Sequence, residues 1–332
     1  MARSEILYRF TVGKPLKLPE NYFAPREYGS PEELKTILLS DYYDTEGNSS
    51  YIFTEHQIKF TIRMSDKPSP NIGNITLFNL DDQLINYLRS NSGNNLVCIL
   101  EAGDNEQGLK QIYKGTISKV DIQDNDTDNF AKMTITDGGL NVKSAYSVRG
   151  YPKGTPYKTV VSDLAGDLKL PLGTLEGVGG VTPSPLNLMG GTHSILERQL
   201  LQQGIDYSIQ NSVINILPQF YRKAQEVSVI TAKSGLIGRI TPIVNDSSTT
   251  NTTLSSDSES VGFRCLLDGS LNPTETVYLQ DREYDGAFKL TSVSFLGDKE
   301  GNLWICECIA KPTQGVLDSS NPTNNTIKIP LR

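Results

Sequence analysis

Short runs with apolar residues at alternate positions dominate two parts of the chain. In HQIKFTIRM, Ile58, Phe60 and Ile62 alternate with polar side chains. Because successive side chains of a strand point to opposite faces, this pattern predicts a β-strand with one buried face. Four similar runs follow: NITLFNL, NLVCILEAG, QIYKGTISKVDI and FAKMTITD. Turn-forming Gly, Asn or Asp bounds each run, so residues 56–145 are predicted to form an antiparallel barrel or sandwich.

A second group of strand-like runs lies between residues 227 and 311. EVSVITA, VGFRCLLDG, TVYLQ, GAFKLTSVSFLG and NLWICECIA are short, apolar and separated by turn-forming residues. We therefore predict a second β domain that superposes on the first despite its different sequence. A single continuous sheet spanning both segments, or an all-helical half, would contradict the interpretation given below.

Helical spacing replaces alternation in residues 146–226. TPYKTVVSDLAGDLKL and THSILERQLLQQG place apolar residues three and four apart, which predicts two helices. Thr192 is predicted to cap the second helix and Gly204 to end it. DYSIQNSVINILP then predicts a hairpin with an Asn-Ser turn. Another helix, NLDDQLINYLRSN, is predicted inside the first β domain with Asp81 as its N-cap.

The ends of the chain lack this regularity. Residues 1–55 and 312–332 are predicted to be irregular arms, with one short helix in SPEELKTILLS. The polar insert NDSSTTNTTLSSDSES within the second β domain is expected to be disordered. The predicted fold class is therefore mainly β with an α+β insert: two β-barrel domains flank a small mixed domain, with an arm at each end.

Charge and hydropathy exclude two kinds of partner. Lys and Arg number 31 against 38 Asp and Glu, a formal net charge of -7, and no basic stripe is present to grip nucleic acid. No stretch reaches the roughly 18 apolar residues that a membrane helix needs. The first residues also lack the apolar segment of a signal peptide. We expect synthesis in the cytoplasm and no membrane insertion.

The residues that carry most enzyme and metal chemistry are sparse. The four cysteines (Cys98, Cys265, Cys306 and Cys308) and two histidines (His56 and His193) form no C-x2-C or H-x3-H pair. We therefore expect reduced, buried thiols. DIQDNDTDNF has the alternate carboxylates of a calcium loop but lacks the turn Gly and the final Glu, which favours a solvated hairpin tip.

No catalytic motif stands out either. The chain has no G-x-S-x-G nucleophile motif, and its glycine cluster around Gly177 lacks the flanking elements of a phosphate loop. We predict no catalytic, cofactor-binding or metal-binding residues, no cofactor and no enzyme activity.

The segment LTSVSFLGDKEGNLWICECIA predicts a hairpin whose second strand is apolar on both faces. Trp304, Cys306 and Cys308 share one face, while Leu303, Ile305 and Ile309 share the other. Such a strand must be covered on both sides, by the core and by another element or a neighbouring subunit. Candidate structural or interface residues are Phe60, Phe78, Phe295, Trp304, Cys306 and Cys308.

This hairpin resembles the C-terminal β domain of tailed-bacteriophage baseplate hub proteins, the late control protein D family. SGLIGRITP, CLLDGSLNPTETVYL and GIDYSIQNSVINILP also resemble segments of that family, as do IKFTIRM, NITLFNL, LEAG and YKGTIS in the same order. The resemblance spans most of Ile58–Ala310. Departures are Asp268-Gly269, where Asn-Pro is usual, and Asp104, where an aromatic residue often stands.

The resemblance implies a structural hub in the virion tail baseplate. Hubs of this family are similar to homotrimers in which two tail-tube-like β domains per chain alternate around an axis. The resulting pseudo-six-fold ring would join the tail tube to the central spike and let DNA pass as transiting cargo. Implied partners are the tail tube, central spike, tape measure and baseplate wedge proteins. A negative inner surface is expected, because it would repel phosphate.

Two alternatives remain open from the sequence. A virion-associated cell-wall-degrading enzyme would need a further domain with two carboxylates in a cleft. A carbohydrate-binding β protein would expose aromatic side chains on loops, for which Tyr42-Tyr43 is the best candidate.

Overall fold

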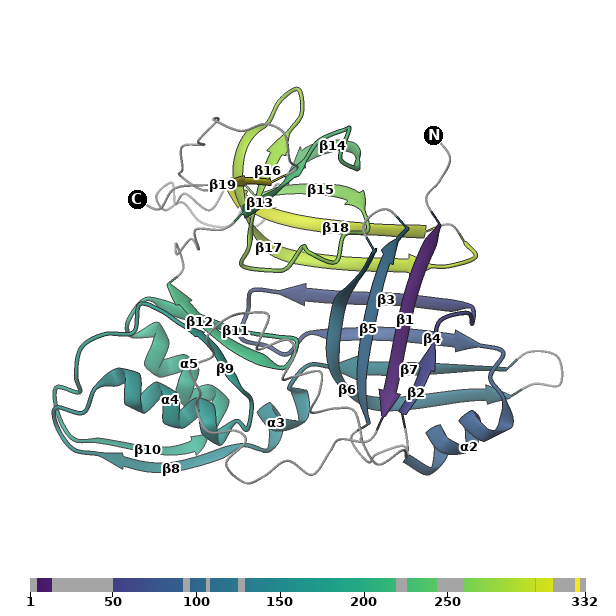
Figure 1. Cartoon of the computed structure of the whole chain (residues 1–332). Helices are drawn as coiled ribbons and strands as arrows, with labels where there is room; N and C mark the ends of the chain where they lie inside the picture. The colour runs from purple at the N-terminus through teal and green to yellow at the C-terminus, as the bar shows by residue number, and fades with distance from the viewer. Residues whose placement is uncertain are drawn as a thin grey trace, which may run out of the picture.

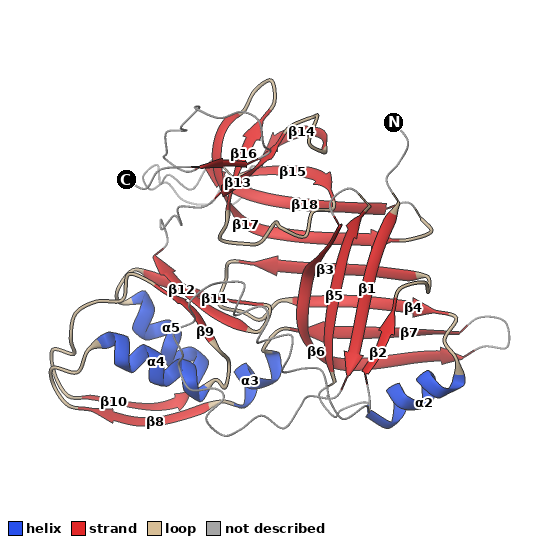
Figure 2. Cartoon of the chain, in the orientation of Figure 1, coloured by secondary structure: helices blue, strands red, loops and turns tan. Residues whose placement is uncertain are grey.

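The computed structural model of the chain describes residues 5–13, 50–91, 96–105, 108–124, 129–218, 226–243, 260–301, 303–312 and 326–328. The fold is mainly β, as the sequence predicts (Figures 1 and 2). One large sheet lies beside a small mixed domain that contains two short sheets and most of the described helical residues. Within the described residues no helix is long and apolar enough to span a membrane.

The large sheet contains fourteen strands. They are β1 (Ile6–Gly13), β2 (Ser50–Phe53), β3 (Ile58–Ser65), β4 (Ile72–Phe78), β5 (Val97–Asp104), β6 (Gly108–Asp124), β7 (Asn129–Thr136), β13 (Glu226–Ile230), β14 (Leu236–Pro242), β15 (Val261–Leu266), β16 (Thr276–Gln280), β17 (Asp285–Asp298), β18 (Leu303–Pro312) and β19 (Thr326–Lys328). Helix α2 (Asp82–Asn91) follows β4, and Asp81 caps it as predicted, its Oδ1 accepting the Leu84 amide at 2.7 Å.

The two β segments are joined into one continuous sheet, so the expectation of separate sheets is wrong. The strand order is β14-β15-β18-β17-β3-β4-β7-β6-β5-β1-β2, and the join lies at β17 and β3. These strands pair antiparallel from Ser292 opposite Ser65 to Asp298 opposite Lys59. Each strand would otherwise present an unpaired edge, and the pairing satisfies both edges at once. One hydrophobic core also runs through both segments.

Two long strands let the sheet fold over its own core. The first half of β6 pairs with β5 and its second half with β7, with a register shift between Ile117 and Lys119. Strand β17 likewise pairs first with β16 and then with β3, with a shift between Leu290 and Ser292 in its pairing to β18. Bulges increase local twist and bend a strand. As a result β1 and β5 cross over β3, β4 and β7 in Figure 1.

The terminal regions contribute to this sheet, which corrects the prediction of two irregular arms. Strand β1 pairs with β5 over eight residues, and β2 pairs with β1. Tyr8, Phe10 and Val12 of β1 are buried at alternate positions, so the strand supplies part of the core. Strand β19 pairs with β13. The predicted helix in SPEELKTILLS, nearly all of the Ser/Thr-rich insert and residues 125–128 of the DIQDNDTDNF tip lie outside the described residues.

The mixed domain has a core of its own. Its elements are α3 (Gly139–Ser144), β8 (Tyr146–Tyr151), α4 (Tyr157–Asp167), β9 (Leu172–Leu175), β10 (Leu186–Gly191), α5 (Thr192–Leu201), β11 (Ile205–Gln210) and β12 (Val213–Pro218). Both predicted helices and the predicted hairpin are present. Thr192, however, is the first residue of α5 and not its cap; its hydroxyl is buried, 2.8 Å from that of Ser147.

A buried polar cluster fastens the mixed domain to the large sheet. Asp137, at the end of β7, accepts hydrogen bonds from the amides of Asn71 at 2.8 Å and Asn211 at 3.0 Å. The Asn71 side chain donates to Asp137 at 3.1 Å and to the Ile209 carbonyl at 2.8 Å. The β11–β12 turn, in which Asn211 and Ser212 both have positive φ, therefore docks through specific hydrogen bonds.

The Asp137 cluster predicts a pH-dependent stability. Burial raises the pKa of Asp137 to about 7, although hydrogen bonds from Asn71 and Asn211 oppose the shift. Between its ordinary value of 3.8 and about 7, the folded protein binds more protons than the unfolded chain, so rising pH lowers stability. We expect the unfolding free energy of the wild type, relative to Asp137→Asn, to fall by about 2 kcal/mol from pH 5 to pH 8. Urea denaturation at both pH values measures this difference; a constant difference would contradict the assignment.

The join between β17 and β3 makes a second prediction. Gly297 stands opposite Phe60, and a Cβ there would lie 2.2 Å from the Phe60 ring. Gly297→Ala should therefore lower the unfolding free energy by about 1–3 kcal/mol through overpacking. Gly166→Ala in α4 is the matched control, because nothing lies within 4 Å of its added Cβ. It should leave stability unchanged or raise it by about 0.5–1 kcal/mol. Equal effects of the two changes in urea denaturation would refute the packing argument.

Candidate interaction surface

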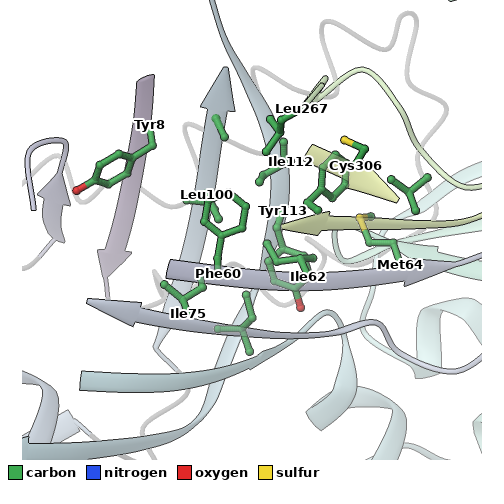
Figure 3. Close-up of a cluster of buried hydrophobic side chains, with 14 of the residues drawn as sticks. Tyr8, Phe60, Ile62, Met64, Ile75, Leu100, Ile112, Tyr113, Leu267 and Cys306 are labelled. Carbon is green, nitrogen blue, oxygen red and sulfur yellow. The ribbon is translucent and has the colours of Figure 1, made fainter. Parts of the chain in front are cut away.

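Five of the six candidate residues lie inside the large core. Phe60, Phe295, Trp304, Cys306 and Cys308 are all buried. The Phe60 and Trp304 rings meet edge to face with centroids 5.1 Å apart. The Trp304 Nε1 donates to the Gly103 carbonyl at 3.2 Å, across to β5. Figure 3 shows Phe60, Cys306 and their neighbours converging from several strands. These residues hold the two β segments of one chain together.

Phe78, the sixth candidate, points away from this core and is half-buried. Its ring lies 5.8 Å from that of Phe130 on β7, and the Lys59 ammonium stands 5.7 Å from its centroid. Phe78 therefore belongs to the opposite side of the sheet, where alternate side chains of the central strands are exposed or half-buried.

We call this side the outer face. It consists of the outward-pointing side chains of seven central strands: Lys59, Thr61, Arg63, Ser65, Ile72, Asn74, Thr76, Phe78, Lys119, Asp121, Phe130, Lys132, Thr134, Thr136, Arg264, Leu266, Ser292, Ser294, Leu296, Asp298, Leu303, Ile305, Glu307 and Ile309. The sequence alternation placed Lys59, Thr61 and Arg63 on a polar face and Leu303, Ile305 and Ile309 on an apolar one, but it did not show that they form one surface.

The outer face has two chemically different halves. On β3, β4 and β7 it is mostly hydroxyl, amide and basic. On β15, β17 and β18 it carries an apolar patch, in which Leu296, Ile305 and Leu266 are successive cross-strand neighbours. Leu266 is 51% exposed and Leu303 is 40% exposed, while Ile309, 39% exposed, is separated from Leu266 and Ile305 by the Arg264–Glu307 pair. Contiguous exposed apolar side chains commonly mark a surface that another molecule covers.

The charges of the outer face do not follow the acidic balance of the whole chain. Its basic side chains are Lys59, Arg63, Lys119, Lys132 and Arg264, and its acidic ones are Asp121, Asp298 and Glu307. Five against three gives this face a formal charge of +2. The excess of acidic residues in the chain therefore lies elsewhere.

All three acidic side chains of the outer face form ion pairs. The distances are 3.1 Å for Lys59–Asp298, 2.7 Å for Lys119–Asp121 and 2.8 Å for Arg264–Glu307. Lys59 and Asp298 bridge β3 and β17, so this pair lies on the join itself. Burial alone would raise the pKa of Asp298. Hydrogen bonds from the Gly301 amide and Lys59 outweigh burial and hold this pKa below its ordinary value. The carboxylate therefore stays ionised at neutral pH.

A small cavity lies where the mixed domain meets the large sheet. Asp66, Asp206, Thr274 and Lys289 are among its lining residues, and its volume of about 20 Å³ has room for about one water molecule. Burial raises the pKa of Asp66 and lowers that of Lys289, and their mutual attraction opposes both shifts. The charged side chains that line this cavity come from both domains. The cavity is too small to hold a substrate. Within the described residues, no group of three or more His, Cys, Asp or Glu side chains could hold a metal ion.

No protein-family model matches the chain, and neither does any curated protein. Solved structures do match. A 43 kDa tail protein of prophage MuSo2 from Shewanella oneidensis aligns with a TM-score of 0.57 at 9% identity, covering 79% of this chain and 96% of its own. A tail protein from Neisseria meningitidis aligns with a TM-score of 0.59 at 10% identity, covering 80% and 94%.

A PdpA–VgrG complex matches as well. A chain of the lidded Francisella PdpA–VgrG complex aligns with a TM-score of 0.57 at 11% identity, covering 93% of this chain and 54% of its own. These identities are too low to transfer a function, but the alignments cover 79–93% of this chain. The resemblance found in the sequence is thereby confirmed for the fold: this chain has the fold of phage tail proteins and of a PdpA–VgrG component.

Proposed function

We propose that this protein is the structural hub of a phage tail baseplate, forming a homotrimeric, pseudo-six-fold ring between the tail tube and the central spike. The observation that carries this proposal is the fold shared with two phage tail proteins, which align with 79% and 80% of this chain. The continuous sheet counts against fully separate ring units, but in the strand order the two β segments pair only at β17 and β3, so each keeps its own set of strands. A ring repeats one contact around an axis until it closes. Three chains with two β segments each supply the six units that meet a six-fold tube.

The two halves of the outer face support different roles in such a ring. The apolar patch on β15, β17 and β18 would contact a neighbouring subunit, because Leu266, Leu303 and Ile309 are too exposed in the single chain. The half on β3, β4, β6 and β7 would face the channel, where hydroxyl and amide groups predominate and Lys59 and Lys119 are paired with Asp298 and Asp121. Arg63 and Lys132 leave this half weakly basic, so the proposed inner surface differs from the expected negative one.

The remaining partners follow from the resemblance to baseplate hubs. The matched chain from the PdpA–VgrG complex is longer than this one, which covers 54% of it. We propose that a central spike protein lies below the ring. Tail tube, tape measure and baseplate wedge proteins would adjoin it in the virion tail.

Assembly can be tested at the apolar patch. We expect light scattering to give a mass about three times the 36.5 kDa of one chain, alone or with the spike protein. Leu266→Lys with Ile309→Lys should weaken the trimer at least about 30-fold, because a charge placed in a buried contact costs about 2 kcal/mol or more. Both residues are exposed in the single chain, so the fold should survive, which circular dichroism checks.

The control for this test changes an exposed apolar pair elsewhere. Val148 and Met189 face each other across the β8–β10 ribbon and are 71% and 74% exposed. Val148→Lys with Met189→Lys should leave the trimer intact. A wild-type monomer under both conditions, or equal loss of trimer in the two double variants, would refute the proposed contact.

The channel-facing half makes a prediction about DNA. Fluorescence anisotropy should detect no binding of duplex DNA to the trimer at micromolar protein and about 0.15 M salt. Asp121→Asn releases Lys119 from its ion pair and should produce measurable, salt-sensitive binding at about 0.05 M salt. Asp163→Asn in α4, away from the sheet, is the control with the same charge change. Micromolar binding by the wild type at about 0.15 M salt would contradict this picture of the channel.

A further inference from the structure

The large sheet and the mixed domain share no apolar core. Their buried apolar side chains fall into two clusters, one in each domain, and no described residue belongs to both. The described helices and strands of the mixed domain pack mainly on one another, and none of them packs at length against a strand of the large sheet. Figure 1 shows the mixed domain on one side of the sheet, with β11 and β12 nearest to it. Domains without a large apolar interface commonly move relative to each other.

Hydrogen bonds from the tip of the β11–β12 hairpin hold the two domains together. The Gln210 side chain donates to the Ser65 carbonyl at 2.6 Å and accepts from the Asn71 side chain at 3.0 Å. The Asn211 side chain accepts the Lys114 amide at 2.9 Å. Each of these polar groups can bond to water instead when the domains separate. Breaking this contact therefore costs less free energy than opening either core.

A second polar contact is the water-sized cavity between the domains. Asp66, Thr274 and Lys289 line it from the sheet, and Asp206 and Asn215 are among the residues that line it from the mixed domain. Polar and charged side chains gain solvation when such a contact opens, whereas apolar side chains would lose the free energy of burial. Neither contact therefore depends mainly on the hydrophobic effect.

The chain enters the mixed domain through two consecutive glycines. Gly138 and Gly139 follow Asp137 and lead from β7 into α3. Gly138 has a φ of 67°, in the region that glycine adopts without steric cost. Domain hinges consist of a few residues at the ends of elements that absorb changes of φ and ψ. This pair can therefore change the orientation of the mixed domain while both cores stay packed. The return connection, residues 219–225, lies outside the described residues.

We propose that the mixed domain is a hinged module that undocks from the large sheet as a rigid body. Gly138 and Gly139 form the hinge. The latch consists of the hairpin tip and the sheet residues to which it bonds. The undocked state is a minor population, because the latch bonds break together. A partner that contacts both domains would select the orientation that it fits. The hinge is a property of the single chain and does not depend on the proposed hub function.

Native-state hydrogen exchange on the full-length protein tests this proposal. Undocking exposes the Lys114 and Asn211 amides together, although these residues are 97 positions apart. Both amides should therefore report the same opening equilibrium. Both should also exchange faster than the amides inside β3 and α4, because those amides open only when one of the cores opens. Mass spectrometry with single-residue fragmentation measures the rates, which are then corrected for intrinsic exchange.

Gln210→Ala removes two hydrogen bonds of the latch. It should raise the exchange of the Lys114 and Asn211 amides at least about 5-fold and by equal factors, and leave β3 and α4 unchanged. Asn129→Ala is the matched control, because it also removes two hydrogen bonds of an amide side chain, both to Leu80 within the large sheet. It should leave the exchange of both latch amides unchanged.

Three results would overturn the proposal. Opening of the β11–β12 ladder amides together with the Asn211 amide would show that only the hairpin tip frays. Unequal opening of the Lys114 and Asn211 amides would show that they do not belong to one rigid-body motion. Exchange of both amides as slow as that of β3 and α4 would show that the domains separate only when the protein unfolds. The wild-type rates decide all three, so the test holds even if Gln210→Ala fails to fold.

Discussion

The pairing of β3 with β17 is the contact on which the rest of the molecule depends. Seven residues of each strand take part, and the pairing turns two β segments into one sheet over one core. The small Gly297 lets the Phe60 ring reach Trp304, and Trp304 in turn bonds to β5. On the opposite side the Lys59–Asp298 ion pair spans the same two strands. Removing the join would therefore expose two strand edges and divide the core.

The alternating pattern of the sequence was enough to locate most central strands, because each has one buried and one polar face. It also identified Phe60, Phe295, Trp304, Cys306 and Cys308 as apolar structural positions, and all five are buried. It could not show that they face the other half of the same chain, since pairing between distant strands leaves no local signal. Strand β1 was not predicted, although Tyr8, Phe10 and Val12 alternate with polar residues. The sequence that follows has no regular spacing of apolar residues, so the whole N-terminal region was predicted to be an irregular arm.

The outer face and the Asp137 cluster lay beyond prediction for a different reason. Lys59, Lys132 and Arg264 come from separate parts of the chain, and only the strand register brings them onto one surface. Asp137 resembles any aspartate at a strand end, yet the tip of a distant hairpin buries it. The prediction that Thr192 caps α5 was wrong because the Thr192 hydroxyl hydrogen-bonds to that of Ser147. This tertiary contact outweighs the local preference of threonine for the N-cap position.

The join between β3 and β17 also sets the order in which the molecule can be completed. A hydrogen bond from Ser292 to the Met64 carbonyl connects positions 228 residues apart. At typical translation speeds of about 5–20 residues per second, β3 emerges roughly 10–50 s before the strand that covers its edge. During that interval the nascent chain presents an apolar core and an unpaired strand to its neighbours on the polysome. An unfinished sheet of this kind is prone to aggregation, so slow synthesis or crowded ribosomes would favour aggregation over folding.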